Sequence, residues 1–176
     1  KTAQIVCFLN DLNLNQGLSG PFLVVAPVSN LSHWKLEFEQ WTNLNCIIFH
    51  GNKESRNMIN DYEIKYFDDD GKEQKNRVGF DVMVTNYEIL RLKEPSQIIS
   101  SIQWRYLVID EAHRMKSLKF DIFNQLKRLE FDHCTLLTEI PIQNDISELW
   151  SLLNFIDPSN EPSEIKTANT KILIHS

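Results

Sequence analysis

The sequence predicts an α/β fold of three layers, with a mostly parallel sheet between two sets of helices. Five short apolar runs are typical of strands buried on both faces: residues 21–29, 45–51, 80–87, 106–110 and 134–138. Segments with apolar residues at helical spacing alternate with them: residues 2–12, 31–41, 58–62, 120–129 and 146–153. Strands that alternate with helices favour parallel pairing and right-handed crossovers.

Composition limits the classes of protein that remain. A chain of 176 residues with 42% apolar residues can bury one core of ordinary domain size. A net charge of −6 gives no general attraction to nucleic acid, so such binding must come from local surfaces. The apolar run at residues 5–9 is too short for a signal peptide or a membrane span, and we expect no membrane partner. Three widely spaced cysteines within apolar runs predict buried reduced thiols: Cys7, Cys46 and Cys134.

One polar segment interrupts the alternation. Residues 66–79 are charged and contain a glycine turn signal, which predicts a surface loop or hairpin.

Two neighbouring acids, Asp110 and Glu111, stand where a predicted buried strand ends. In a parallel sheet the carboxyl ends of the strands share one edge, so Thr85 and Thr138 should lie in the same crevice. Magnesium-dependent phosphate chemistry uses such a pair: Asp holds the metal, usually through water, and Glu activates the attacking water. His113 is close enough to couple this site to a neighbour.

Two plainer interpretations of these acids stay open. Asp110 could cap a helix whose dipole favours Glu111. A zinc hydrolase is a weaker alternative, because Asp-Glu-Ala-His lacks the spacing that places two imidazoles on one helical face.

Lys1 and Thr2 open the first predicted helix. Lys followed by Ser or Thr at the mouth of a helix is the end of a phosphate-binding P-loop, in which Lys reaches the β and γ phosphates and Thr ligates magnesium. The alternative is an ordinary surface lysine.

The combined blocks resemble the first ATPase lobe of SWI/SNF-type superfamily 2 helicase-like proteins. These blocks are "KTAQIVCFLNDL", "GPFLVVAPVSNLSHWKLEFEQW", "FDVMVTNYEIL", "WRYLVIDEAHRMKS" and "LLTEIPIQNDISELWSLLNFIDP". The stretch "HGNKESRNMINDYE" is most similar to the chromodomain-helicase-DNA-binding subgroup. The resemblance implies a RecA-like P-loop NTPase lobe over residues 1–158, with its first strand and the Gly-rich part of the P-loop expected before Lys1. Residues 159–176 would be a linker or the start of the inter-lobe region.

The resemblance also implies roles in ATP and Mg2+ binding. Lys1 and Thr2 match the end of motif I and would contact phosphate and magnesium. Asp110 and Glu111 match the Walker B acids of the DEAH box, as metal holder and water activator. His113 matches the residue that relays nucleotide state to motif III and the second lobe.

Two further motifs imply contacts with the DNA backbone. Their candidate residues are Ser29, Asn30, Thr85 and Asn86. Strand-end hydroxyls and amides can hold phosphates without reading bases, although turn and cap duty is an equal alternative for the first two. Trp34 and Trp41, at helical spacing, are expected in the core.

Motif III departs from the family pattern. The coupling residues are Thr138, Glu139, Ile140, Pro141 and Gln143, where relatives usually have Gly and Thr in place of Glu139 and Ile140. An added carboxylate near Asp110 and Glu111 should weaken nucleotide binding or its coupling to motion.

The resemblance implies a nuclear ATP-dependent chromatin remodeler. The full-length protein would be a DNA-dependent ATPase that translocates on double-stranded DNA and moves nucleosomes, with a second ATPase lobe as partner. We expect the isolated chain to be inactive. The alternative is a degenerate lobe that does not hydrolyse ATP and acts as a binding or scaffold module.

Overall fold

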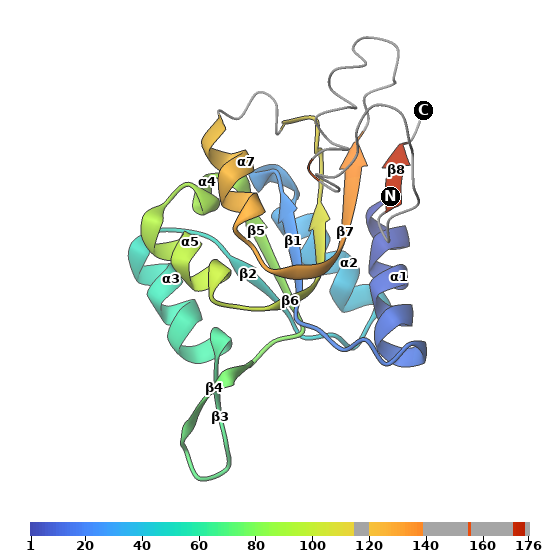
Figure 1. Ribbon diagram of the computed structural model, residues 1–176. Helices are drawn as coiled ribbons and strands as arrows, with labels where there is room; N and C mark the ends of the chain where they lie inside the picture. The colour runs from blue at the N-terminus through green and yellow to red at the C-terminus, as the bar shows by residue number, and fades with distance from the viewer. Residues whose placement is uncertain (115–119, 139–154, 156–170, 175–176) are drawn as a thin grey trace.

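A six-stranded parallel sheet forms the centre of the molecule (Figure 1). The computed structural model describes residues 1–114, 120–138, 155 and 171–174. In spatial order, the strands are β2 (Cys46–Phe49), β5 (Val82–Asn86), β1 (Phe22–Ala26), β6 (Trp104–Ile109), β7 (Phe131–Thr138) and β8 (Lys171–Ile174). Each of the five apolar runs predicted as strands therefore overlaps a strand of this sheet, although β6 and β7 begin two and three residues before the predicted runs.

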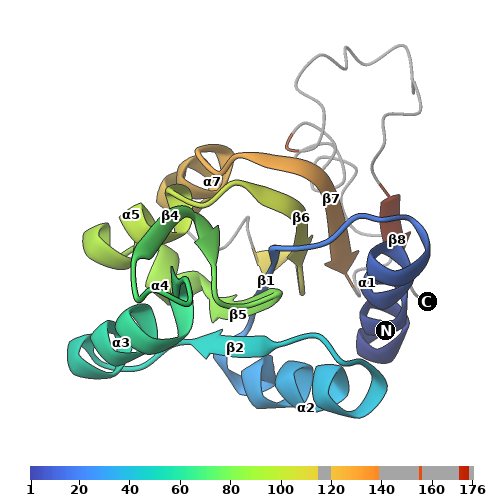
Figure 2. The same ribbon diagram turned by 90° about the horizontal axis from the view of Figure 1, so that it is seen from below.

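Helices cover both faces of the sheet, which confirms the three-layer α/β prediction (Figure 2). One face packs against α1 (Thr2–Asn15) and α2 (Leu31–Trp41). The other is covered by α3 (Lys53–Ile59), the π-helical turn η2 (Asn60–Ile64), α4 (Tyr87–Leu90), α5 (Lys93–Ser100) and α7 (Phe120–Lys127).

Strand β1 shows why the predicted strands are apolar at every position. Phe22, Val24 and Ala26 face the cluster under α1 and α2, whereas Leu23 and Val25 face the opposite cluster. Each residue of this strand is buried because successive side chains of a strand point to opposite faces. Packing on both faces extends to Ala26, the last residue of the strand, and so fixes the carboxyl end of β1, where the candidate site lies.

The polar segment forms the predicted hairpin. Strands β3 (Lys65–Phe67) and β4 (Glu73–Val78) pair antiparallel and make a separate two-stranded sheet. Gly71 has a φ of 74° in the turn between them, a conformation that glycine adopts without steric strain. Figure 1 shows the hairpin extending away from the central sheet.

Several elements differ from the sequence-based expectation. The short helices α4 and α5 were not predicted. Strand β8 lies within residues 159–176, expected to be a linker or the start of the inter-lobe region. Strand β8 pairs parallel with the end of β7, with Lys171 opposite Thr135 and Ile174 opposite Thr138. The predicted helix at residues 146–153 lies outside the described residues.

The burial of two side chains was predicted wrongly. Trp41 is 58% exposed, since it lies in the last turn of α2 and donates its indole N–H to the Glu37 carboxylate at 2.9 Å. Cys7 is exposed because α1 turns Ile5 and Leu9 towards the sheet, and Cys7, two residues from each, points away. Apolar spacing therefore predicts that a segment is helical more reliably than it predicts which of its side chains are buried.

In the part of the chain that the structure describes, no helix combines the length and apolar character needed to cross a membrane.

The cysteines give a direct test of this packing. Burial raises the pKa of the Cys46 thiol to about 12, and burial raises the pKa of Cys134 as well. At about pH 8 iodoacetamide should therefore alkylate Cys7 and leave Cys46 and Cys134 unmodified until the protein is unfolded. Peptide mass spectrometry measures this order, and equal labelling of all three thiols in the native protein would contradict it.

The free energy of unfolding should fall as the pH rises above about 9, because the Cys46 thiol ionises there in the unfolded protein and stays protonated in the folded protein.

Candidate active site

The carboxyl ends of β1, β6 and β7 bring the predicted site residues to one edge of the sheet. A cavity of about 260 Å³ lies there, lined by Lys1, Thr2, Asn30, Asp110, Glu111, Leu137 and Thr138. The amino end of α1 forms one side of it, and the Lys1 ammonium donates to the Thr138 carbonyl oxygen at 3.5 Å. Both predicted pairs, Lys1 with Thr2 and Asp110 with Glu111, therefore line the same small cavity.

The turn after β6 is fixed by backbone hydrogen bonds to both neighbouring strands. The Asp110 N–H donates to the Val25 carbonyl of β1, and the Ala112 N–H donates to the Leu137 carbonyl of β7, each at 2.8 Å. Between these two anchors Glu111 has a φ of 51°, in the left-handed region that non-glycine residues seldom adopt. Hydrogen bonds on both sides thus hold the backbone of the two acids in one conformation.

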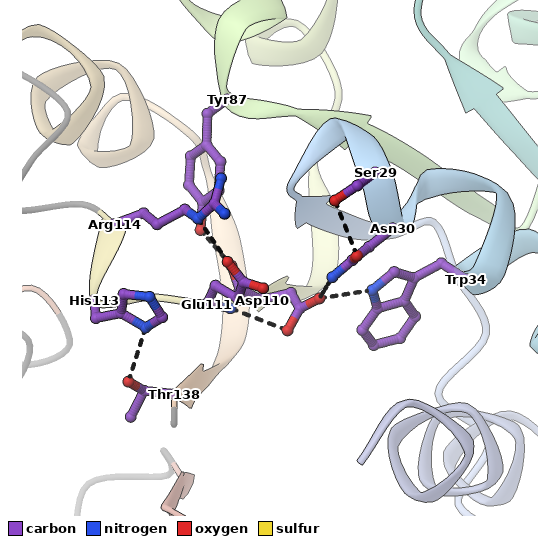
Figure 3. Close-up of polar contacts among 9 residues, drawn as sticks. All are labelled: Ser29, Asn30, Trp34, Tyr87, Asp110, Glu111, His113, Arg114 and Thr138. Atoms are coloured by element: carbon purple, nitrogen blue, oxygen red, sulfur yellow. Dashed lines mark hydrogen bonds and ion pairs between the residues drawn. The ribbon is translucent and has the colours of Figure 1, made fainter. Parts of the chain in front are cut away.

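Four donors converge on Asp110 (Figure 3). One carboxylate oxygen, Oδ2, accepts from the Asn30 amide at 3.2 Å and from the Trp34 indole N–H at 3.0 Å. The other, Oδ1, accepts from the Glu111 backbone N–H at 3.0 Å. The backbone carbonyl of Asp110 accepts from the Tyr87 hydroxyl. These donors are all neutral, so the carboxylate is oriented without an ion pair from them.

The Tyr87 hydroxyl donates a hydrogen bond to the Asp110 carbonyl, and its surroundings favour the protonated form. Burial raises the pKa of its hydroxyl, and the negative charges of Asp110 and Glu111 raise it further. The raised pKa keeps the hydroxyl protonated near neutral pH, where it can donate to the end of β6.

Glu111 and His113 point away from the Trp34 side of Asp110 (Figure 3). The Glu111 carboxylate forms an ion pair with Arg114, 2.5 Å from Nε. The Nδ1 atom of His113 lies 3.4 Å from the Thr138 hydroxyl at the end of β7. This contact joins the turn after β6 to the strand that leads into the predicted coupling motif.

The groups that could ligate a metal at the cavity suit magnesium better than a metal whose ligands all come from the protein. Among the described residues no three His, Cys, Asp or Glu side chains lie close enough to form a metal cluster. Asp110 and Thr2 together offer the cavity a carboxylate and a hydroxyl. Magnesium is usually held by one or two such groups, with waters and phosphate oxygens as its other ligands, so these residues fit the predicted ion.

The predicted DNA contacts fall into two different environments. Ser29 is exposed in the 3₁₀ turn η1 (Val28–Asn30) and donates to the Asn30 side chain at 3.2 Å. Thr85 is fully buried, and its hydroxyl donates to the Phe49 carbonyl at 2.8 Å. Asn86 is 2% exposed; its amide donates to Glu88 and its oxygen lies 2.9 Å from His50 Nδ1. DNA contact stays a prediction, and accessibility favours it for the η1 residues.

Sequence reasoning missed several residues of this edge. Tyr87 and His50 each lie in the last two residues of an apolar run predicted as a strand, which is a signal that they stand at its carboxyl end. Arg114 follows Glu111 by three residues, the spacing of a helical ion pair. Trp34 was expected in the core, which the structure confirms, but its hydrogen bond to Asp110 was not anticipated.

Four members of the predicted coupling motif lie outside the described residues: Glu139, Ile140, Pro141 and Gln143.

Comparison with known proteins decides the family. The sequence model of the SNF2-related domain matches residues 1–166. The chain belongs to the SNF2-related domain family. The predicted resemblance to the chromodomain-helicase-DNA-binding subgroup is also confirmed. Human chromodomain-helicase-DNA-binding protein 8 is 41% identical over 164 residues, 93% of this chain and 6% of that protein, and human chromodomain-helicase-DNA-binding protein 6 gives the same values.

Solved structures agree with this assignment. The SWI2/SNF2 ATPase core of Sulfolobus solfataricus in complex with dsDNA matches 90% of this SNF2-related chain and 29% of its own, with a TM-score of 0.71 and 27% identity. The chain thus spans about 6% of the length of the curated relatives it matches and under a third of the ATPase core.

Replacing Thr85 with Val separates a structural role from DNA contact. The change removes the hydroxyl and leaves the Phe49 carbonyl without this donor, which should lower the free energy of unfolding by about 1–3 kcal/mol. Urea unfolding measures this loss, and DNA affinity measured by fluorescence anisotropy should not change. A weakened DNA affinity at unchanged stability would show that the hydroxyl contacts DNA.

Proposed function

We propose that this chain is part of the first ATPase lobe of an ATP-dependent chromatin remodeler. ATP hydrolysis at the cavity would drive translocation on double-stranded DNA. The single observation that supports this most strongly is that Lys1, Thr2, Asp110 and Glu111 line one cavity although more than a hundred residues separate the two pairs in the sequence. Membership of the SNF2-related family supports the same conclusion.

The cavity suits the phosphate end of a nucleotide. Its volume of about 260 Å³ lies below the roughly 300–1,000 Å³ of pockets that enclose a whole drug-sized ligand. The Lys1 ammonium would neutralise phosphate charge, and the amino end of α1 would add the positive end of its dipole. The adenosine part would then lie outside this cavity.

Each side chain of the cavity has a proposed task in hydrolysis. Thr2 and Asp110 would hold Mg2+, which would supply positive charge to the phosphates. Glu111 would orient and deprotonate the attacking water. His113, in contact with Thr138, would pass the state of the site to motif III.

The proposed DNA surface is the η1 turn at the end of β1. Ser29 is exposed there and Asn30 is partly buried, so both can offer neutral donors to phosphate oxygens. The similar Sulfolobus core was solved with dsDNA, which supports this class of ligand.

The remaining proposals concern the full-length protein. A second ATPase lobe would complete the nucleotide site, and nucleosomes in the nucleus would be the substrate. The chromodomain-helicase-DNA-binding relatives support these proposals, and their far greater length leaves room for the second lobe.

Glu111→Gln tests the chemistry of the cavity. The amide cannot accept the proton of the attacking water, so kcat for ATP in the full-length protein should fall at least about 100-fold, while nucleotide binding persists. A coupled assay with and without duplex DNA measures kcat, and a fluorescent nucleotide measures binding.

Glu94→Gln is the matched control for that variant. Both substitutions break a solvent-accessible ion pair, Glu111 with Arg114 and Glu94 with Lys53, but only the first lies at the cavity. The control should keep the activity of the unsubstituted protein. Equal kcat for both variants, or an unsubstituted protein without DNA-stimulated hydrolysis, would exclude the proposed enzyme.

The competing proposal is a lobe that binds partners without hydrolysing ATP. It rests on the sequence, which places Glu139 where relatives have Gly, one residue after Thr138 at the cavity. If the added carboxylate weakens coupling, replacing Glu139 with Gly and Ile140 with Thr should raise DNA-stimulated ATP hydrolysis severalfold. Unchanged hydrolysis in the double variant would show that these residues do not limit it.

A further inference from the structure

The Asp110 carboxylate is held from the side of α2 by two donors one helical turn apart. Asn30 and Trp34 both donate to the same oxygen, Oδ2, at 3.2 and 3.0 Å (Figure 3). Residues four apart on a helix lie on one face, so the start of α2 presents both donors towards the end of β6. The other oxygen, Oδ1, is held by the Glu111 N–H.

Trp34 is the rigid member of this pair. Its side chain is fully buried against the sheet, and its ring lies 6.2 Å from that of Phe38, measured between centroids. An indole has one donor and no acceptor, so a buried Trp34 has no alternative use for its N–H. The hydrogen bond to Asp110 therefore fixes the carboxylate relative to α2.

Asn30 is the member that also faces outward. It stands at the cap position of α2, yet its side chain makes no capping hydrogen bond and turns to Asp110. Its oxygen accepts from the exposed Ser29 hydroxyl, and Asn30 itself lines the cavity. A ligand that binds Ser29 or Asn30 from solvent must compete with or reorient these two hydrogen bonds.

We propose that Asn30 and Trp34 are positioning residues that link the η1 turn to the metal-holding Asp110. A DNA phosphate bound at η1 draws the Asn30 amide away from Oδ2. The Trp34 hydrogen bond keeps Oδ2 next to α2, and the carboxylate turns about that remaining bond. This inference rests on the proposed function and adds to it the route by which DNA stimulates hydrolysis.

Two buried tryptophans provide a matched pair of variants. Trp34 and Trp104 are both fully buried, and each donates its indole N–H at 3.0 Å, Trp34 to Asp110 and Trp104 to the Ile99 carbonyl in the opposite layer. Phe in either position keeps an aromatic ring and removes the donor. Trp104→Phe therefore reproduces the packing change of Trp34→Phe without touching Asp110.

The experiment measures DNA-stimulated ATP hydrolysis in the full-length protein as a function of Mg2+. Trp34→Phe should lower kcat about tenfold, a loss of about 1.4 kcal/mol in transition-state stabilisation, and should raise the Mg2+ concentration needed for half-maximal rate. DNA affinity should stay within about twofold, because Trp34 is buried. Trp104→Phe should leave kcat and the Mg2+ requirement unchanged. Thermal melts of both variants show whether each one folds.

Asn30→Ala keeps the proposal testable if Trp34→Phe does not fold, because Asn30 lies at the cavity edge and outside the core. It should reduce the ratio of DNA-stimulated to basal kcat. Two outcomes would overturn the inference when DNA stimulates the unsubstituted protein. One is that Asn30→Ala has the same ratio of DNA-stimulated to basal kcat as the unsubstituted protein. The other is that folded Trp34→Phe needs the same Mg2+ concentration for half-maximal rate as the unsubstituted protein. An unsubstituted protein without ATP hydrolysis would overturn the proposed function together with this inference.

Discussion

The candidate site depends on the backbone of one turn. Asp110 and Ala112 continue the hydrogen bonding of the sheet beyond the end of β6, one towards β1 and the other towards β7. Glu111, between them, must adopt its left-handed φ of 51° to connect the two anchors. A strained residue persists only where its surroundings determine it, and here the central strands of a buried parallel sheet do so. Both acids are thus positioned by backbone hydrogen bonds to the two neighbouring strands.

The same carboxylate is shared by two surfaces. On one side Lys1 and Thr2 face Asp110 across the cavity, and on the other Asn30 and Trp34 hold its Oδ2 atom. The donors on the α2 side are an amide and an indole N–H, so neither of them compensates the carboxylate with a positive charge. The α2 side thus orients the Asp110 carboxylate, and the cavity side is where the proposed ion would meet its charge.

Sequence alone predicted the sheet well because its strands are buried on both faces, and a short, continuous apolar run such as Phe22–Ala26 is typical of that environment. It predicted the shared edge of Asp110 and Thr138 from topology, which parallel pairing makes compulsory. It could not give the hydrogen bond from Trp34, because apolar spacing reports burial and not the direction of one N–H. Nor could it show that Thr85 bonds Phe49, since a strand-end hydroxyl can face solvent or backbone equally well. Helix α5 was missed because Pro95 and the polar residues of Lys93–Ser100 obscure its period.

The central claim is that the cavity at the carboxyl edge holds the phosphates of ATP between Lys1 and Asp110. The most direct measurement is a structure of the full-length protein with Mg2+ and a non-hydrolysable ATP analogue. We predict that the γ-phosphate lies within hydrogen-bonding distance of the Lys1 ammonium and that the metal lies on the Asp110 side. A nucleotide bound elsewhere, with Asp110 and Glu111 free of metal and phosphate, would contradict the account.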